Sequence, residues 1–548
     1  MVKTTVVLTR LNKIDEYIII ISFNCAVKED GSRVSHCICF GSQEEEKRRQ
    51  RTTWIKNWLN RRSSHGYGRY GKLLRGLRSE PGKDWAITNG TCMRSKTNFS
   101  EDSVNFAPFV LLPSTMPRRD FEQVVSLQTA FQELIHYVAN DREFLTKCLT
   151  KIIEVDSFTA KLFEIYETVQ EEGETQPISV GVLRCDYMME TEKLNGEKCH
   201  ENGFPPFSWK LVEINNIAAG FGWLGPASGL LHRYILQEMN LYDKSSNLPE
   251  NNCLSEFCKS FLEAWKIYGN CQAVILMVVE DVIYNICDQR HHEFKFRELN
   301  PQVKFIRRTL TEIYKTGKLN EKKELVVGND VVSVVYFRCG YNPLQYPTEN
   351  EWTARLLIER SKAIKCPNIQ YHLAGTKKVQ QELAKPGVID RFIKDRRKVE
   401  LIRDVFVGIY GLEFDDDGEK AVRMALKTPE RYVLKPQREG GGNNVYGKDV
   451  KEYLERMANS KERESWIMME RIIPPIIRGY MVKPGGSNPP PISEMILELG
   501  IFGIIIGTPK TIITNIQTGH MVRSKIATAN EGGVMIGLGA LDSPYLLQ

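Results

Sequence analysis

Three consecutive glycines, Gly440 to Gly442, limit the possible folds of this chain more than any other feature. They stand in the segment VLKPQREGGGNNVYG (433–447), directly after a strand-like run. Without Cβ atoms, the backbone N–H groups of such a run can approach an anion closely and can adopt positive φ. Lys435 and Arg438 add positive charge, and no Gly-Lys-Ser/Thr closes the run as in a Walker A loop. The segment is therefore either an ordinary hairpin tip or a flap that closes over the phosphates of ATP.

The composition is that of an ordinary globular protein. The chain has 548 residues, of which 42% are hydrophobic and 26% charged, enough for two to four packed domains. The net charge is +6, but eleven Lys and Arg and no acid lie between Lys47 and Arg78. This one segment more than accounts for the excess, and the nearly neutral remainder argues against a nucleic-acid-binding protein.

The cysteines and the apolar runs indicate a cytoplasmic protein that does not bind membranes. The thirteen Cys are scattered singly, without a CxxC pair or a zinc-like spacing, and we interpret them as reduced thiols. The longest apolar candidate, YIIIISFNCAV (17–27), is shorter than the 18–20 residues that a bilayer requires. It follows Asp15 and Glu16, whereas a signal peptide has a basic region there, so secretion is the less favoured alternative.

The hydrophobic patterns predict a chain of mixed α and β structure. We expect residues 1–82 to be a basic, flexible N-terminal extension, and the globular part to begin near Lys83. Helical spacing over 120–153 predicts amphipathic helices, and 178–190 and 207–222 are typical of strands. Alternating strands and helices over 271–374 predict a small α/β domain with a parallel sheet. The C-terminal third is rich in strands with intervening helices, which is typical of an α+β domain.

Oxygen-bearing side chains alternate on one predicted strand. Glu213 and Asn215 are two residues apart in LVEINN and therefore point to the same face. Carboxylate and amide oxygens are ligands for Mg²⁺, which usually keeps phosphates as its other ligands. Glu439, inside the glycine-rich segment, could meet them from the opposite side. The alternative is a polar strand end without a metal.

Three arginines stand at the predicted ends of apolar strands. Arg184 follows VGVL, Arg338 follows VVYF, and Arg523 lies in GHMVRSK. Arg binds carboxylates through two parallel hydrogen bonds, although a single buried Arg is more often part of a structural salt bridge. Three such arginines, with Lys377 and Lys525 available as well, favour an anionic substrate rich in carboxylates.

Six motifs resemble those of eukaryotic glutathione synthetase, in the family's order and from about Lys83 to the C-terminus. They are VLKPQREGGGNNVYG, ELGIFG, VVYFRCGY, AGTKKVQQEL, VEINNIAAGFG and GHMVRSKIATANEGG. The resemblance implies a circularly permuted ATP-grasp ligase, usually a homodimer, with Mg²⁺ as the metal and ATP as a co-substrate. Its body would comprise 83–270 and 375–548, and 271–374 would be the substrate-binding domain. The family phosphorylates the cysteinyl carboxylate of γ-glutamylcysteine, and glycine then displaces the phosphate to give glutathione, ADP and phosphate.

The resemblance also implies a role for individual residues. The residues similar to the magnesium ligands are Glu213, Asn215 and Glu439. Those similar to the ATP-binding residues are Glu213, Lys377, Lys435, Glu439, Gly440, Gly441, Gly442, Asn443, Asn444, Tyr446, Met469, Glu470, Arg471, Ile472, Glu498, Lys525 and Glu531. Those similar to the substrate contacts are Arg184, Ile217, Ala218, Ala219, Gly220, Asn285, Gln289, Arg338, Tyr341, Arg523, Val534 and Met535. Arg523 and Arg184 would stabilise the transition state.

The chain departs from the family pattern mainly at substrate positions. IAAG (217–220) replaces a serine-bearing ISAS, so hydroxyls expected near the substrate are absent. Ile283 stands where a Glu is expected, Cys339 replaces Asp, and Glu531 stands where Asp is usual. Met535 and Ile536 replace two alanines in the loop that closes on the acceptor. The acceptor is therefore glycine or another amino acid, and the chain is alternatively a divergent paralogue with a changed acceptor or dipeptide, or a non-catalytic nucleotide-binding protein.

Overall fold

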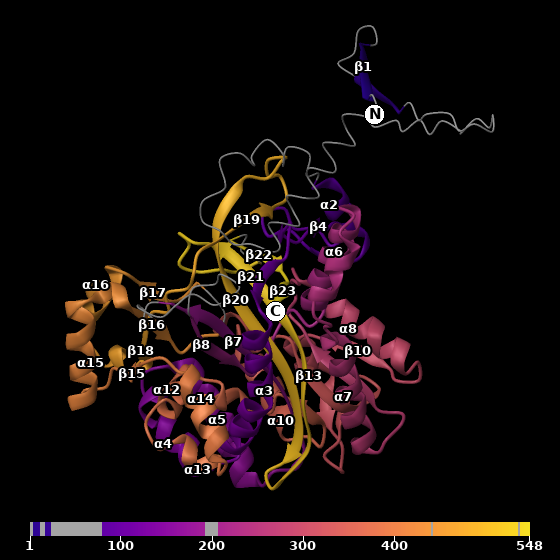
Figure 1. The fold of residues 1–548 in the computed structure, drawn as a ribbon. Helices are drawn as coiled ribbons and strands as arrows, with labels where there is room; N and C mark the ends of the chain where they lie inside the picture. The colour runs from indigo at the N-terminus through magenta and orange to yellow at the C-terminus, as the bar shows by residue number, and fades with distance from the viewer. Residues whose placement is uncertain (1–3, 11–16, 24–78, 192–206, 440–441, 535–537) are drawn as a thin grey trace. The chain divides into compact units, whose positions relative to one another are not determined.

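The computed structural model describes residues 4–10, 17–23, 79–191, 207–439, 442–534 and 538–548 (Figure 1). The chain divides into two compact units, one of 1–78 with 236–245 and one of 79–235 with 246–548. In the first unit, β1 (Thr4–Arg10) and β2 (Tyr17–Phe23) form an antiparallel pair in which Thr4 lies opposite Phe23. Every predicted site residue belongs to the second unit.

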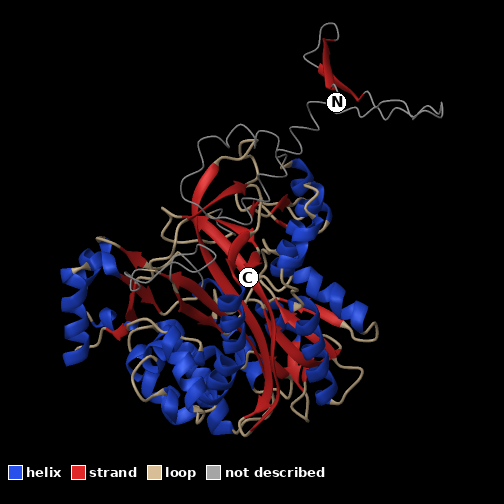
Figure 2. Cartoon of the chain, in the orientation of Figure 1, coloured by secondary structure: helices blue, strands red, loops and turns tan. Residues whose placement is uncertain are grey.

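A thirteen-stranded mixed sheet is the centre of the second unit, with helices packed around it (Figure 2). The parallel half runs in the order β10 (Phe305–Arg308), β9 (Val274–Val278), β13 (Asp330–Phe337), β14 (Ile364–Cys366) and β7 (Ser179–Glu190). The antiparallel half contains β8 (Ser208–Asn215), β20 (Ile492–Thr508), β21 (Thr511–Ile526), β19 (Ile477–Val482), β5 (Phe109–Val110) and β22 (Gly539–Asp542), and β11 (Gly317–Leu319) and β12 (Leu325–Val327) extend β13. The predicted parallel strands are therefore present, and they continue directly into β7.

The hairpin of β20 and β21 runs through the middle of this sheet (Figure 1). Strand β20 is an almost continuous apolar run because helices cover both of its faces. Ile501 and Ile505 belong to the core beneath α3 (Arg118–Ala139), whereas Phe502 and Ile504 belong to the core beneath α7 (Cys253–Tyr268). The face that carries Phe502 also carries Gly500 and Glu498 nearer the start of the strand, so a charged residue lies where the apolar cover ends.

Helices α3 and α4 (Arg142–Ile153) lie where the helical spacing over 120–153 predicted them, and α5 (Ser157–Glu172), which was not predicted, follows. The side chain of Asp141 accepts the N–H of Phe144 at 2.9 Å, and that of Asp156 accepts the N–H of Thr159 at 2.8 Å. These N-caps set the starts of α4 and α5. Further helices are α2 (Glu80–Thr88), α6 (Leu224–Glu238), α8 (Ile286–Leu299), α9 (Leu310–Thr316), α10 (Glu349–Glu359), α11 (Ile369–Ala374), α12 (Lys377–Leu383), α13 (Ile389–Phe392) and α14 (Arg396–Val405).

A second, four-stranded antiparallel sheet carries the glycine-rich segment. Its strands lie in the order β15 (Ile409–Gly411), β18 (Trp466–Glu470), β16 (Tyr432–Pro436) and β17 (Val445–Tyr446), with α15 (Asp416–Lys427) and α16 (Asp449–Arg456). Leu434, Met468 and Leu454 belong to its own small core. Short strands complete the unit: β3 (Cys92–Met93) with β4 (Asn105–Phe106), and β6 (Ser114–Pro117) with β23 (Pro544–Leu547).

Two arginines do not lie where the sequence pattern placed them. Arg184 is in the middle of β7, and Arg523 lies inside β21, three residues before its end. Both strands continue with residues that the antiparallel sheet buries, so neither arginine ends its strand. Arg338 does follow the last residue of β13, as predicted.

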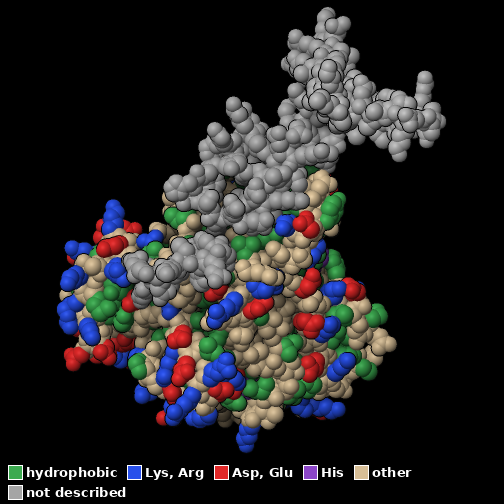
Figure 3. Space-filling view, in the orientation of Figure 1, with side chains coloured by type: hydrophobic (Ala, Val, Ile, Leu, Met, Phe, Trp, Pro, Cys, Tyr) green, Lys and Arg blue, Asp and Glu red, His purple; other side chains and the backbone are tan. Residues whose placement is uncertain are grey.

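The described surface carries charges of both signs, and the described cysteines are free thiols. On the face shown in Figure 3, Lys and Arg are interspersed with Asp and Glu over the described part of the second unit. The nine cysteines within the described residues are free, and Cys253 and Cys258 are fully buried, as expected for small apolar side chains. Among the described residues, no helix is both long and apolar enough to cross a membrane.

Candidate active site

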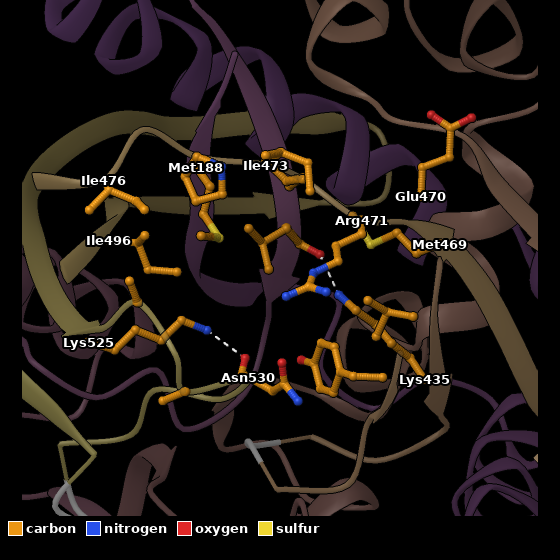
Figure 4. A pocket seen from close by; sticks show the side chains of 17 residues that line it. Met188, Lys435, Met469, Glu470, Arg471, Ile473, Ile476, Ile496, Lys525 and Asn530 are labelled. Atoms are coloured by element: carbon orange, nitrogen blue, oxygen red, sulfur yellow. Dashed lines mark hydrogen bonds between the residues drawn. The ribbon is translucent and has the colours of Figure 1, made fainter. Parts of the chain in front are cut away.

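A cavity of about 230 Å³ collects seven of the seventeen residues predicted for the nucleotide (Figure 4). Lys435 on β16 and Lys525 on β21 face it, and their ammonium groups donate to the carbonyls of Val212 (3.0 Å) and Asn530 (2.6 Å). Burial lowers the pKa of both lysines, which increases the benefit of an anionic ligand. The cavity is lined by Met188, Val212, Val433, Lys435, Tyr446, Met469, Glu470, Arg471, Ile472, Ile473, Pro474, Ile476, Ile496, Lys525, Ala527, Ala529 and Asn530. Apolar walls with two lysines suit an aromatic base with attached phosphates.

A lysine stands between two predicted metal ligands beside this cavity. The Lys377 ammonium, at the start of α12, lies 4.0 Å from Glu213 Oε2 and 3.7 Å from Glu439 Oε1. It also donates to the carbonyl of Arg438 at 2.6 Å, which ties α12 to the glycine-rich segment. Burial would raise the pKa of Glu213, but Lys377 and Lys435 outweigh it and hold that pKa at about 2. Both carboxylates therefore surround a point where a cation is stabilised.

The side-chain nitrogen of Asn215 is already used, which leaves its oxygen for a ligand. The Nδ2 group donates to the carbonyl of Arg184 at 3.2 Å and to Asp186 Oδ2 at 3.1 Å. Two carboxylates and one amide oxygen match the donors that Mg²⁺ prefers, so Glu213, Asn215 and Glu439 fit this metal. Over the described ranges, no cluster of three or more His, Cys, Asp or Glu side chains is arranged to bind a metal.

The glycine-rich segment is a hairpin loop whose described amides bind an anionic group. Strands β16 and β17 pair antiparallel, and Gly442 has φ of +99°, which glycine adopts without strain. The N–H groups of Gly442 and Asn444 both donate to the Glu531 carboxylate, the second at 3.2 Å. The two alternatives for this segment are thus compatible. Gly440 and Gly441 lie outside the described residues.

Arg438 does not add its charge to this loop. Its Nη1 group donates to Asp156 Oδ2 at the N-terminus of α5, and its guanidinium lies 5.8 Å from the centre of the Phe158 ring. The side chain therefore attaches the base of the hairpin to the helical layer. The lysines, and not Arg438, supply the positive charge beside the loop.

Two arginine–carboxylate pairs lie next to one another on the sheet. Arg184 donates from Nε and Nη2 to the two oxygens of Asp186, at 2.6 and 2.7 Å. Arg523 lies opposite Glu498 in the hairpin register and donates to it from Nε at 3.0 Å. Its Nη2 is also 3.5 Å from Asp186 Oδ2. Glu498, one of the residues similar to the ATP-binding residues, here holds Arg523 and does not line the cavity.

The loop after β8 is held by one arginine that follows β13 and by another within β7. Arg338 donates to the carbonyl of Ala219 at 3.3 Å, and Arg184 donates to the next carbonyl, that of Gly220, at 3.2 Å. Ala218 and Phe221 have positive φ of 50° and 77°, which is strained for residues with a Cβ atom. The side chains of Ala219 and Ile217 are buried, so this loop offers its backbone and the Ala218 and Gly220 positions to a ligand.

A buried aspartate fixes the other side of this loop. Asp288 accepts the N–H groups of Phe221 (3.1 Å) and Trp223 (2.9 Å) and pairs with Arg338 at 3.0 Å. Arg338 is 4% exposed, so this arginine is first of all a structural element of the loop. Its side chain is therefore already engaged by three partners, which include the Tyr336 hydroxyl.

The remaining predicted contacts are spread along α8 and the β13 end. Gln289 links Asn285, which accepts its amide at 3.0 Å, to Arg307, which donates to it at 2.6 Å. The N–H of Tyr341 donates to Gln345 at 3.0 Å. Ile283 is half-buried and packs against the α7 core, and Val534 is buried. Met535 and Ile536 lie outside the described residues.

The sequence pattern missed two buried acids and most of the cavity wall. Asp186 follows Arg184 by two residues, a spacing that puts both side chains on one strand face and could have indicated the pair. Asp288 carries a weaker signal, an acid in the first turn of α8. Met188, Val212, Val433, Ile473, Pro474, Ile476 and Ile496 come from separate strands and loops, so only the fold brings them together.

Comparison with known proteins shows the family to which this chain belongs. Residues 77–546 match the family model of the eukaryotic glutathione synthase ATP-binding domain. A protein called glutathione synthetase from Xenopus laevis is 40% identical over 466 residues, which are 85% of this chain and 95% of that protein. The human protein of that name is 38% identical and the chloroplastic one from Arabidopsis thaliana 38% identical, each over 84% of this chain and over 95% and 84% of their own lengths. The chain belongs to the eukaryotic glutathione synthetase family.

A solved structure supports the architecture. A glutathione synthetase-like effector from Globodera pallida, in the apo form, superposes with a TM-score of 0.67 at 24% sequence identity. The match covers 87% of this chain and 97% of that one. At this identity the likeness concerns the fold alone, a mixed α/β arrangement around a large mixed sheet.

Proposed function

We propose that this protein is an ATP-dependent ligase of the glutathione synthetase type, which joins glycine to γ-glutamylcysteine. The observation that carries the proposal is the cavity in which Lys435, Lys525 and Tyr446 meet Met469 to Ile472, beside the Lys377–Glu213–Glu439 cluster. The four-stranded sheet and the main sheet would hold ATP between them, which is the ATP-grasp arrangement. The family membership supports the same activity.

The first step would transfer the γ-phosphoryl group of ATP to the cysteinyl carboxylate. One carboxylate oxygen attacks the γ-phosphorus, the bond to the β-phosphate oxygen breaks, and ADP leaves with an acyl phosphate formed. Lys377 and Lys435 would hold the phosphates, and the amides of Gly442 and Asn444, which already bind a carboxylate, would receive their oxygens. Bound Mg²⁺, held by Glu213, Asn215 and Glu439, would neutralise phosphate charge.

The second step would be the attack of the glycine amine on the acyl phosphate. The new C–N bond forms as the C–O bond to phosphate breaks, and the amine loses a proton. Negative charge develops on the carbonyl oxygen, where Arg523 and Arg184 would stabilise it. Both guanidiniums are fixed before the reaction by Glu498 and Asp186, so little reorganisation is required of them.

A second candidate is the same chemistry with another acceptor amino acid or dipeptide. The structure favours it at Gly220, where a Cβ atom would lie 3.5 Å from Arg338 Nη2 and 3.9 Å from Asp288 Oδ2. A side chain would fit there, but the glycine offers none to a substrate. Homodimer formation and a cytoplasmic location are further proposals from the family resemblance.

Release of ADP by the purified full chain tests the proposal. The reaction contains ATP, Mg²⁺ and γ-glutamylcysteine with each of a panel of acceptor amino acids, and product mass is measured. Turnover with glycine supports the proposed function, and turnover only with another amino acid supports the second candidate. ATP binding without ADP release for any acceptor would overturn both and leave a nucleotide-binding protein.

A further inference from the structure

We propose that Asp186 is a positioning residue that sets the geometry of both arginines and of the amide ligand in the site. The inference rests on the proposed function, because it assigns roles to groups that this function uses. Asp186 is fully buried in the middle of β7 and touches three side chains that were predicted to bind ligands. It was itself not among the predicted site residues.

Each Asp186 oxygen holds a different combination of partners. Oδ1 accepts Arg184 Nε at 2.6 Å, and Oδ2 accepts Arg184 Nη2 at 2.7 Å. Oδ2 also accepts Asn215 Nδ2 at 3.1 Å and lies 3.5 Å from Arg523 Nη2. A bidentate ion pair fixes the plane of the guanidinium as well as its position. The remaining Nη1 of Arg184 is thereby directed to the carbonyl of Gly220.

The contact with Asn215 distinguishes Asp186 from a residue that only forms a structural ion pair. An amide side chain can turn by half a rotation at little cost unless its hydrogen bonds select one orientation. Asp186 accepts hydrogen bonds only, so it selects the orientation in which the Asn215 nitrogen faces β7. The Asn215 oxygen is then left for the proposed metal. The Arg184 carbonyl, which also accepts from the Asn215 nitrogen at 3.2 Å, favours the same orientation, so an Asn at position 186, which could donate as well as accept, would weaken this selection.

Strand β20 leaves room for the ion pair of Asp186 and Arg184. Gly500 on β20 lies opposite Asp186, and a Cβ atom at this glycine would lie 2.7 Å from Asp186 Oδ1 and 2.9 Å from Arg184 Cδ. These distances are below normal contact, so any side chain at this position would displace the ion pair. The glycine is required here for space, and the two residues form one unit across β7 and β20.

The test compares Asp186→Asn with a buried pair that has no ligand nearby. Arg355 Nε and Glu359 Oε1 on α10 are 2.9 Å apart and both side chains are buried, so Glu359→Gln is the matched control. The first readout is the Mg²⁺ dependence of binding of a fluorescent ATP analogue, which does not require turnover. The second is ADP release with γ-glutamylcysteine and an accepted amino acid, and the third is the melting temperature.

We expect Asp186→Asn to raise the half-saturating Mg²⁺ concentration and to lower kcat, each about 10- to 100-fold, as for residues that orient metal ligands. Glu359→Gln should lower the melting temperature and leave the Mg²⁺ dependence within about twofold. Gly500→Ala is the second variant if Asp186→Asn does not fold, with Gly479→Ala as its control, since a Cβ atom at Gly479 would come too close only to the flexible end of Met495 and would touch Val110 at an ordinary 3.4 Å. Gly500→Ala should shift the Mg²⁺ dependence in the same direction as Asp186→Asn.

The outcomes separate this inference from the proposed function. If the Asp186 and Gly500 variants lose stability but retain the wild-type Mg²⁺ dependence of nucleotide binding, Asp186 is only structural and the inference is overturned. It is also overturned if Glu359→Gln shifts that dependence equally. If the wild type binds the analogue with Mg²⁺ but releases no ADP, the proposed function fails while the binding readout still decides the role of Asp186.

Discussion

Glu531 Oε1 accepts the backbone N–H of Asn444 at 3.2 Å, and the same carboxylate accepts the N–H of Gly442. A side chain from the segment after β21 thus holds the described part of the glycine-rich hairpin loop. Charge-assisted hydrogen bonds of this kind contribute about 1.5–3 kcal/mol each when they are shielded from water. The carboxylate occupies amides that we assign to phosphate oxygens.

This contact leads to a prediction for Glu531→Ala. Without the carboxylate, the loop loses an attachment, so trypsin should cleave the nucleotide-free variant at Arg438 about fivefold faster or more than wild type. With Mg²⁺ and ATP present, phosphates would replace the carboxylate and the difference should shrink. Cleavage is measured by mass spectrometry of timed samples, with cleavage at a site outside the loop as the control. Equal loop cleavage without nucleotide would contradict the prediction.

Glu439→Gln tests the carboxylate pair around Lys377. The substitution keeps the size of the side chain but removes one of the two negative charges beside the ammonium. We expect Mg²⁺–ATP binding to weaken by about 10- to 100-fold while the binding of γ-glutamylcysteine changes little. Isothermal titration of each ligand separates the two effects. Wild-type turnover at limiting Mg²⁺ would show that Glu439 is not a metal ligand.

The acceptor loop provides a third prediction. Met535 and Ile536 stand where the family has alanines, and the larger side chains would reduce the space for the acceptor or reshape it. The double variant Met535→Ala, Ile536→Ala should shift the ratio of kcat/KM values toward glycine relative to larger amino acids. Competition between acceptors, with products separated by mass, measures this ratio. An unchanged ratio would mean that this loop does not select the acceptor.

Acid should destabilise the protein through buried neutral histidines. His232 is fully buried between Ser543 Oγ and the carbonyl of Val110, both 2.6 Å away, and burial lowers its pKa to about 4. Because an unfolded His has a pKa of about 6.5, the unfolded chain takes up the proton first as the pH falls. The stability from this neutral ring is present above about pH 6.5 and is lost toward pH 4, on the order of 3 kcal/mol.

Urea unfolding at pH 7 and pH 5 measures this effect. Wild type should lose stability between these values, and His232→Gln should lose less, because it removes one group that is protonated on unfolding. The histidines His292 and His520, whose pKa burial also lowers to about 4, remain in the variant and keep part of the dependence. The same pH dependence in both proteins would contradict the role of His232.

The sequence predicted those features that depend on short stretches of chain. Strands β7, β8, β16 and β20 follow from apolar runs, and Glu213 and Asn215 share a face because strand side chains alternate. Arg184 was assigned to a strand end, although the strand predicted over 178–190 continues past it through CDYMME, and β7 has the longer bounds. The pairing of β7 with β20, which buries the later residues, is decided by segments over three hundred residues away.

The sequence pattern also could not show which residues meet across neighbouring strands. Arg523 and Glu498 are in register only because the β20–β21 hairpin shifts by a residue at two irregular positions further along. Asp186 and Gly500 come together across two strands, and neither residue type alone indicates a site. Such contacts depend on tertiary structure, whereas the motifs that identify the nucleotide end are contiguous.

The adjacent carbonyls of Ala219 and Gly220 make the two ends of the substrate site thermodynamically dependent on one another. One carbonyl is bound by Arg338, at the end of the parallel strand β13, and the other by Arg184 within β7, where the sheet changes from parallel to antiparallel pairing. A ligand carboxylate that draws either guanidinium toward itself frees one carbonyl of a loop already strained at Ala218 and Phe221. The binding free energy of that ligand then includes the cost of rearranging the contact at the other arginine. The two substrates therefore cannot bind independently of one another.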